Sequence, residues 1–509
     1  TGDKAIGNDI TGNEASASKS VRSETLETET SLPNFRQGDA IILYERNRDT
    51  DNVTNKMVFK GNIEYLTENE IGIRLRATQQ NPSVLPAESL YAIEHDTMDT
   101  TFRSMYQGLY IYLSARKERR DLLLSQRPPR FDESLDSMIS RSEDDFTRIA
   151  LKAKAAQDYF LLIGPPGTGK TSCALKKMVE TFHADKDAQI LLLSYTNRAV
   201  DEICKSLASI APAVDFIRVG SELSCDEAYR GHLIENELSS CNRRSEVYER
   251  IRNCRIIVGT VAAISGKPEL FRLKHFDVAI IDEATQILEP QLLGILCARG
   301  EDGKDAIDKF VLIGDHKQLP AVVQQNTEQS AIYDESLLSI GLTNLKDSLF
   351  ERLYRNCTAT VHRSYDMLCR QGRMHPEVAL FANRAFYGGR LIPVGLPHQI
   401  ESSDTICRLA FYPSVPEKAG ASAKINYSEA RIVADLAVRI YEDHQTDFDE
   451  SRTLGIITPY RSQIALIKKE IESLGIPALN RILVDTVERF QGSERDVIIY
   501  SFCVNYPYQ

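Results

Sequence analysis

Near-continuous apolar runs recur along residues 145–340, separated by longer stretches of mixed polarity. The runs are YFLLIG, AQILLLSY, DFIRVG, CRIIVGT, DVAIID and KFVLIGD. Unbroken apolar strands of this kind are typical of parallel sheets that are buried on both faces. Helical patterns lie between them, and one, at about 222–253, is polar enough to form a surface insertion. The pattern predicts a doubly wound α/β domain over residues 145–340.

Residues 341–509 repeat this style more loosely. Strands are predicted at RLAFYP, LGIITPY, ILVDTV and RDVIIYSF, with helical segments between them. We therefore expect a second α/β domain over residues 341–509, in series with the first.

The first hundred residues have a different pattern. Residues 1–32 are rich in Ser, Thr, Glu and Gly and have few apolar residues, which predicts a disordered tail. In residues 33–98, short runs such as DAIILYE and EIGIRLRA alternate between apolar and polar positions, as half-buried strands do. Several short strands in so few residues indicate a small barrel or sandwich, and we assign this region as a β-barrel accessory domain.

A helical segment, residues 99–144, links the predicted barrel to the first α/β domain. An apolar stripe predicts a helix that ends before Pro128-Pro129. The residues of the stripe are Phe102, Met105, Leu109, Tyr112 and Leu113. The helix is either a stalk that carries the barrel or an element packed on the next core. The pattern does not choose between these two arrangements.

Composition excludes several classes of protein. A chain of 509 residues is too long for one core, and roughly three or four domains are expected. A net charge of −11 argues against a protein that coats polyanions over its whole surface, but it allows a local basic channel. The ten cysteines form no CxxC pair, which favours reduced thiols in an intracellular protein and gives no support to a metal cluster. No apolar run is long enough to span a membrane.

The segment GPPGTGKTS follows the strand YFLLI and precedes a helical pattern, which is the context of a phosphate-binding loop. Glycines in such a loop let backbone N–H groups surround a phosphate at the positive end of a helix. We expect Lys170 to reach the β- and γ-phosphates and Thr171 to bind Mg²⁺. The predicted ATP-binding residues of the loop are Gly164, Pro165, Pro166, Gly167, Thr168, Gly169, Lys170, Thr171 and Ser172.

Two further strand ends carry polar side chains that suit nucleotide hydrolysis. Asp282 and Glu283 follow the run VAII, so Asp282 is expected at the metal and Glu283 at the attacking water. Gln318 in LIGDHKQLP can hydrogen-bond a γ-phosphate and lose that bond after hydrolysis. Lys170, Glu283 and Gln318 are therefore predicted catalytic residues, and Thr171 and Asp282 are predicted metal ligands.

Together these segments resemble a known family. The chain carries, in matching order and spacing, GPPGTGKTS, SYTNRAVDEI, VGTVAAIS, IIDEATQ, LIGDHKQLP, RQGRMHP, ITPYRSQ and VDTVERFQGSERDVII. These motifs resemble those of superfamily 1B helicases of the DNA2/NAM7 (Upf1-like) group, and the chain is most similar to the helicase core of the replication helicase–nuclease type. The resemblance covers about residues 35–505.

The resemblance implies two tandem RecA-like domains with ATP and Mg²⁺ between them and a β-barrel on a helical stalk. It implies an ATP-dependent helicase or translocase that moves 5′ to 3′ on single-stranded nucleic acid, with DNA favoured over RNA. Relatives continue to a final arginine motif, so we expect residues 341–509 to be an incomplete second domain of a longer protein. A nuclease or another domain can lie outside these residues.

By the same resemblance, RQGRMHP presents Arg373 to the γ-phosphate as an arginine finger, and Gln371 helps to orient the nucleotide or the finger. Many relatives have Tyr where this chain has Gly372, and the glutamine expected upstream of the phosphate loop is absent. Loose recognition of the base is therefore expected.

The resemblance also assigns residues to nucleic acid and to the coupling of the two ligands. Gly492 and Glu494 resemble residues that lie near the γ-phosphate and ribose. The expected contacts with single-stranded nucleic acid come from Thr196, Asn197, Thr260, Pro459, Tyr460 and Thr486. Hydroxyl, amide and backbone groups of this kind grip phosphates without reading sequence, while Tyr460 can stack on a base.

Two other functions remain open. One is a nucleic-acid-stimulated ATPase that switches or remodels RNA–protein complexes without processive unwinding. The other is a non-catalytic scaffold of helicase shape, which has no need for the complete set of Lys170, Thr171, Asp282, Glu283 and Gln318. The expected location is intracellular, in the cytoplasm of a bacterium or in the nucleus or cytoplasm of a eukaryote.

Overall fold

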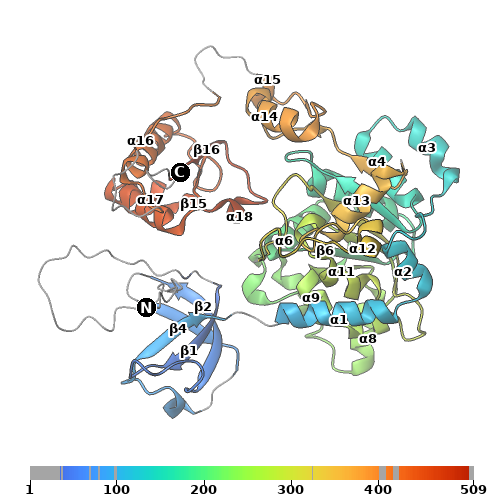
Figure 1. The fold of residues 1–509 in the computed structure, drawn as a ribbon, viewed down its shortest axis with the longest axis horizontal. Coiled ribbons are helices and arrows are strands. Elements are labelled where there is room, and N and C mark those ends of the chain that lie inside the picture. The colour runs from blue at the N-terminus through green and yellow to red at the C-terminus, as the bar shows by residue number, and fades with distance from the viewer. Residues whose placement is uncertain are drawn as a thin grey trace, which may run out of the picture. The chain divides into compact units, whose positions relative to one another are not determined.

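The computed structural model describes residues 35, 38–67, 70–77, 81–96, 100–323, 325–360, 362–400, 408–415 and 424–503 (Figure 1). The predicted tail, residues 1–32, lies outside these ranges. The chain divides into one unit of residues 100–410 and another that comprises residues 1–99 and 411–509. Separate cores identify three bodies within this division, and each is described by itself.

The unit of residues 100–410 is built around a seven-stranded sheet in which every strand pair is parallel. The strand order is β11-β5-β10-β9-β6-β8-β7. The bounds of the strands are β5 Tyr159–Ile163, β6 Ile190–Ser194, β7 Phe216–Val219, β8 Ile256–Thr260, β9 Phe276–Ile281, β10 Ile307–Gly314 and β11 Tyr365–Met367.

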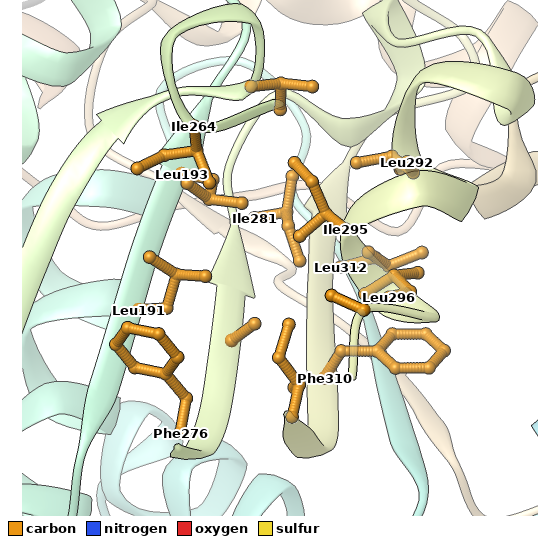
Figure 2. Packing of buried hydrophobic residues seen from close by; sticks show 14 of the residues in the cluster. Leu191, Leu193, Ile264, Phe276, Ile281, Leu292, Ile295, Leu296, Phe310 and Leu312 are labelled. Atoms are coloured by element: carbon orange, nitrogen blue, oxygen red, sulfur yellow. The ribbon is translucent and has the colours of Figure 1, made fainter. Parts of the chain in front are cut away.

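Both faces of this sheet are buried, which explains the unbroken apolar runs. Along β5, Leu161 faces one core, whereas Phe160 and Leu162 face the other. Figure 2 shows the first core, where Leu292 and Ile295 from α11 approach the inner strands. Successive side chains of a strand point to opposite faces, so a strand between two helical layers needs apolar residues at every position.

Helices cover both faces of the sheet. One face carries α4 (Asp145–Ala155), α5 (Lys176–His183) and α6 (Asn197–Ala208). The elements that contribute to the other core include α2 Lys117–Leu123, α8 Arg244–Asn253, α9 Val261–Ser265, α10 Glu269–Leu273, α11 Glu289–Leu296 and α13 Leu349–Ala359. Within the described ranges, no helix has both the length and the apolar character that crossing a bilayer requires.

The edge strand β11 lies beyond residue 341, where the sequence suggested a second domain. Its residues Tyr365–Met367 pair with Leu161–Ile163 of β5, so the first sheet continues past the expected boundary. The unit then runs on through β12 (Arg370–Gln371), α14 (Pro376–Tyr387), β13 (Ile392–Pro393) and α15 (Pro397–Ile400) to residue 410. A short strand such as β11 has too few residues to reveal which sheet it joins.

The insertion predicted near 222–253 is helical and contains α7 (Ile234–Glu237) and α8. Arg250 of α8 binds Glu237 at 2.8 Å and Asp215 at 2.9 Å, which ties the insertion to the segment before β7. A further short helix, α12 (Glu335–Ser339), follows β10, and α3 (Asp136–Arg141) precedes α4.

The segment predicted as a stalk contains α1 (Thr100–Ser114), and this helix packs on α11. The predicted stripe is packed only in part: Tyr112 lies against the core, whereas Phe102, Leu109 and Leu113 are exposed. Contact is also made at Gly108, where an added Cβ would lie 2.3 Å from the carbonyl oxygen of Pro290. Glycine gives no apolar signal, so periodicity identified the packed face of the helix only in part.

The N-terminal body is a four-stranded antiparallel sheet with the order β3-β2-β1-β4. Its strands are β1 Ala40–Glu45, β2 Val58–Leu66, β3 Ile71–Leu75 and β4 Tyr91–His95. Ile41, Phe59 and Ile63 form the centre of a small core. The described residues thus contain the predicted strands but no pairing of β3 with β4 that would close a barrel.

The body of residues 424–503 has a three-stranded parallel sheet with the order β15-β14-β16. Its elements are α16 Tyr427–Asp443, β14 Leu454–Ile457, α17 Arg461–Ser473, β15 Leu483–Asp485, α18 Val487–Phe490 and β16 Val497–Tyr500. Apolar residues of α16 and α17 pack with the strands in one core. The strand predicted at RLAFYP is absent, since the described residues 408–413 are irregular.

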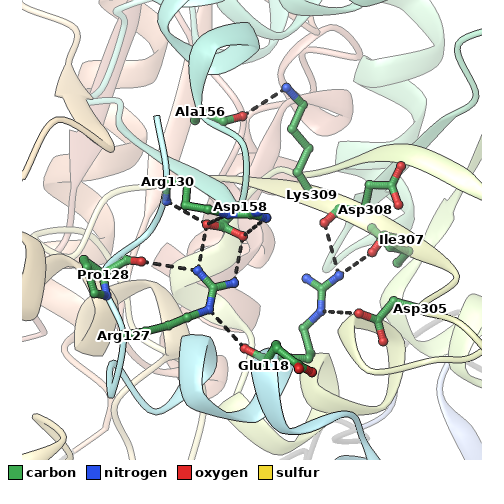
Figure 3. A network of polar contacts seen from close by, with 11 residues as sticks. Glu118, Arg127, Pro128, Arg130, Ala156, Asp158, Asp305, Ile307, Asp308 and Lys309 are labelled. Carbon is green, nitrogen blue, oxygen red and sulfur yellow. Dashed lines mark hydrogen bonds and ion pairs between the residues drawn. The ribbon is translucent and has the colours of Figure 1, made fainter. Parts of the chain in front are cut away.

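A charged network holds the amino-terminal edge of the seven-stranded sheet. Asp158, directly before β5, is 3% exposed and accepts hydrogen bonds from Arg127 at 2.8 Å and Arg130 at 3.0 Å (Figure 3). Burial alone would raise the pKa of Asp158, but the two guanidinium groups hold it well below its usual value. The network borders a cavity of about 1120 Å³. Its hydrogen bonds also fix the segment that leads into β5.

Replacing Asp158 with Asn should destabilise the unit by about 3 kcal/mol, because two guanidinium groups lose a buried charged partner. Chemical unfolding followed by circular dichroism measures this change. Asp136→Asn is the matched control, since Asp136 pairs with Arg363 on the surface and exposed pairs contribute less than about 1 kcal/mol. Equal losses in both variants would contradict the importance of the buried network.

Candidate ATP site and nucleic-acid interface

The phosphate-binding loop follows β5 and leads into a π-helical turn, Lys170–Leu175, that continues as α5. Gly164 donates its N–H to the carbonyl of Gly314 at 2.9 Å, which fastens the loop to the end of β10. The aliphatic part of Lys170 lies over Gly164, where an added Cβ would be 2.0 Å from its Cγ. The loop therefore folds back on itself, so that the Lys170 side chain packs against its first glycine.

Thr171 and Asp282 come together although they are far apart in the sequence. The Thr171 hydroxyl donates to the Asp282 carboxylate at 2.5 Å, and Asp282 is 1% exposed. The meeting point lies at the carboxyl ends of β5 and β9. A hydroxyl and a carboxylate are the oxygen ligands that Mg²⁺ prefers, so these side chains fit the predicted metal position.

Glu283 stands beside this pair and has an unusual backbone. Its φ of 53° is in the left-handed region, which non-glycine residues occupy at a cost. Burial, followed by the neighbouring Asp282, raises its pKa to about 7, whereas Lys170 and Arg198 oppose the shift. A carboxyl group that titrates near neutral pH is suited to accept a proton from water.

Gln318 is held at the carboxyl end of β10. Its side-chain amide donates to the buried carboxylate of Asp315 at 2.6 Å and approaches the carbonyl of Gly164 at 3.5 Å. Tyr387, the last residue of α14, donates its hydroxyl to the same Asp315 oxygen at 2.7 Å. The amide therefore lies next to the phosphate loop.

The segment RQGRMHP touches the phosphate loop directly. Gly372 donates its N–H to the carbonyl of Gly167 at 2.9 Å. Gly167 has a φ of +73°, and an added Cβ there would lie 2.4 Å from the Cβ of Arg373. Gly167 is thus required both by its backbone angle and by the close approach of the segment that carries the predicted arginine finger.

Gln371 shapes that segment from within. It is 1% exposed, and its side chain accepts from the backbone N–H groups of Arg373 at 3.0 Å and Met374 at 2.8 Å. Its amide donates to the Met374 carbonyl at 2.7 Å. The geometry therefore gives Gln371 contacts with the backbone of Arg373, the predicted arginine finger. Gly372 carries no aromatic ring, and its carbonyl lies 3.0 Å from the imidazole of His398.

Three residues predicted to contact nucleic acid lie at the same edge of the sheet. Thr196 caps α6 by accepting from Ala199 at 3.1 Å, and Thr260 caps α9 in the same way. Thr196 follows β6 and Thr260 is the last residue of β8; these are neighbouring parallel strands, so both residues lie at one edge. Thr196 and Asn197 are exposed, whereas Thr260 is largely buried.

The remaining predicted residues lie in the body of residues 424–503. Pro459 and Tyr460 follow β14, and Thr486 follows β15, its parallel neighbour. These three residues consequently share one edge of the small sheet, and Tyr460 is 37% exposed. Gly492 and Glu494 lie in the loop between α18 and β16, where Gly492 has a φ of +76°.

The sequence analysis missed three residues that act on predicted catalytic groups, either directly or, for Tyr387, through Asp315. Tyr387 binds Asp315 across 72 positions of the chain, and no local pattern announces this pairing. Gln286 and Arg198 both favour the charged form of Glu283. Arg198 directly follows Asn197 in the motif SYTNRAVDEI, and this position was the one sequence signal that could have pointed to it.

Family models match most of the α/β part of the chain. One model described as an AAA domain matches residues 141–247 and 234–326, and a second model with the same description matches residues 345–506. The two matches include the phosphate loop, the strand ends at Asp282 and Gln318, and RQGRMHP.

Known proteins similar to this chain are helicases. It is 27% identical to the DNA replication ATP-dependent helicase/nuclease DNA2 of Bos taurus, covering 92% of this chain and 45% of that protein. It is also 27% identical to the helicase/nuclease JHS1 of Arabidopsis thaliana, over 95% of this chain and 36% of that one. The DNA polymerase alpha-associated DNA helicase A of Saccharomyces cerevisiae is 23% identical, over 80% of this chain and 67% of its own.

The chain thus spans less than half the length of these two helicase/nuclease relatives. Among solved structures, the Arterivirus nonstructural protein 10 helicase with DNA is 15% identical with a TM-score of 0.31, and the match covers 66% of this chain and 61% of that one. That similarity is too low to inform the details of the fold.

Replacing Glu283 with Gln should stabilise the metal-free and nucleotide-free protein at pH 8. The pKa of Glu283 is about 7 in the folded protein and 4.5 in the unfolded chain. As the pH rises from 4.5 to 7, the unfolded chain releases this proton first, so the free energy of unfolding falls. The variant removes that penalty and should gain roughly 1–3 kcal/mol at pH 8 and much less at pH 5.

Urea unfolding in EDTA at the two pH values measures the difference. Glu222→Gln, at an exposed glutamate in the insertion, is the control for loss of a surface charge. A gain of the same size at pH 5 and pH 8 would contradict the raised pKa of Glu283.

Proposed function

The chain belongs to the DNA2/NAM7-like superfamily 1B helicases, an ATP-hydrolysing family, and we propose that it is a motor on single-stranded nucleic acid. In this proposal it moves 5′ to 3′ and prefers DNA to RNA. ATP and Mg²⁺ drive the movement.

The observation that carries this proposal is the convergence of the hydrolytic residues at one edge of a parallel sheet. Lys170, Thr171, Asp282, Glu283 and Gln318 follow three strands, β5, β9 and β10, and Thr171 contacts Asp282 at 2.5 Å. A scaffold that only binds partners has no use for a complete phosphate site of this kind. The completeness of this phosphate site favours an enzyme over a scaffold.

Hydrolysis follows from the positions of these groups. Lys170 holds the β- and γ-phosphates, and Glu283 accepts the proton of the attacking water. Mg²⁺, held by Thr171 and Asp282, would neutralise charge on the phosphates. Arg373, on the segment that contacts Gly167, supplies positive charge where negative charge develops in the transition state.

Nucleic acid would be gripped at helix starts that follow the strands. Thr196 and Asn197 are exposed at the start of α6, and the N–H groups of a helix start are suited to phosphate oxygens. In the body of residues 424–503, Pro459 and Thr486 offer similar contacts, and Tyr460 offers an aromatic face for stacking. Gly492 and Glu494 would relay the state of the nucleotide to this grip.

The preference for DNA rests on the relatives, two of which are named DNA replication helicase/nucleases. This chain covers less than half of each, and we place any nuclease activity in a further domain outside these 509 residues. A role in DNA metabolism implies an intracellular protein.

Single-stranded DNA should stimulate ATP hydrolysis strongly, and single-stranded RNA should do so more weakly. Glu283→Gln should lower the stimulated rate by about 10²–10⁴-fold, as expected for loss of a general base. Phosphate release without polymer, with each polymer, and with the variant measures these rates. Glu222→Gln should hydrolyse ATP at the normal rate.

Unwinding of duplexes with a 5′ or a 3′ single-stranded tail measures direction. A motor that moves 5′ to 3′ unwinds the 5′-tailed duplex. Stimulated hydrolysis without unwinding of either duplex would favour a switch or remodeller, and stronger stimulation by RNA would overturn the DNA preference.

A further inference from the structure

We propose that Tyr387 is a positioning residue for the γ-phosphate sensor, acting through Asp315 on Gln318. This inference rests on the proposed ATPase function and names a residue that belongs to none of the motifs. Tyr387 does not touch the nucleotide in this proposal. It sets how readily Gln318 can leave Asp315 to bind the γ-phosphate.

The three residues form a compact hydrogen-bonded group. The same carboxylate oxygen of Asp315 accepts from the Tyr387 hydroxyl at 2.7 Å and from the Gln318 amide at 2.6 Å. Its second oxygen accepts from the backbone N–H of Lys317 at 3.0 Å. Asp315 is 2% exposed and Tyr387 is 5% exposed, so water has little access to replace a lost partner.

A buried carboxylate needs its hydrogen bonds, because leaving it unsatisfied is costly. When Gln318 turns toward a γ-phosphate, it gives up its bond to Asp315. Tyr387 remains in place as a donor to the same oxygen, so the carboxylate keeps a side-chain partner in both positions of Gln318. Burial, followed by the charge of Asp315, raises the pKa of Tyr387, which keeps its hydroxyl protonated as a donor.

Tyr387 also connects the sensor to the predicted arginine finger. It is the last residue of α14, and this helix begins at Pro376, three residues after Arg373. The segment before the helix contacts Gly167 in the phosphate loop, while the end of the helix contacts Asp315 beside the sensor. One helix thus joins the two sides of the phosphate site.

Removal of the hydroxyl in Tyr387→Phe leaves Gln318 as the side-chain donor to that oxygen and holds it on Asp315. The expected result is a roughly tenfold weaker affinity for a non-hydrolysable ATP analogue, with an unchanged affinity for ADP. ADP lacks the γ-phosphate that Gln318 would contact. Titration calorimetry with the β,γ-imido analogue and with ADP measures both affinities.

Two further variants separate positioning from general damage. Tyr112→Phe removes a buried hydroxyl that has no hydrogen-bond partner among the described residues, and it should leave both affinities unchanged. In a Gln318→Ala background, Tyr387→Phe should cause no additional loss, because its effect passes through Gln318.

An unchanged ratio of the two affinities in Tyr387→Phe would overturn the proposal. So would equal weakening of the analogue and ADP, which indicates general damage, or a full additional loss in the Gln318→Ala background. Wild-type protein that binds neither nucleotide would overturn the proposed ATPase function itself, and this outcome is distinct from the others.

Discussion

The phosphate site depends on one geometric constraint, which is that all seven strands of the central sheet run in the same direction. Their carboxyl ends therefore lie at one edge, and segments distant in the sequence meet there. Gly164 forms a hydrogen bond with Gly314, and Thr171 with Asp282, because β5, β9 and β10 end together. Burial of the sheet on both faces keeps this edge rigid, so the positions of the side chains are fixed by the core.

The segment RQGRMHP extends this arrangement. It follows β11, the edge strand next to β5, and so emerges beside the phosphate loop. Gln371 shapes the turn from inside, and Gly167 leaves room for Arg373 to approach. The segment that carries Arg370 and Arg373 therefore lies beside the phosphate loop.

Much of this fold could be predicted because the signals are local. A strand buried on both faces has apolar residues throughout, and a phosphate loop has a fixed spacing of glycine and lysine. The packed face of α1 could be predicted only in part, since Tyr112 carries an apolar signal and Gly108 does not. Nor could the extent of the first sheet, because β11 has only three residues, Tyr365–Met367. The pairing of Tyr387 with Asp315 exists only in three dimensions.

The choice of a glycine for the packed face of α1 has a practical consequence for handling the protein. The outer face of this helix presents the large side chains Phe102, Tyr106, Leu109, Tyr110 and Leu113. An exposed apolar stripe of this kind favours aggregation. Polar replacements at Phe102 and Leu113, which are 59% and 67% exposed, would make the protein more soluble while leaving the phosphate site as it is.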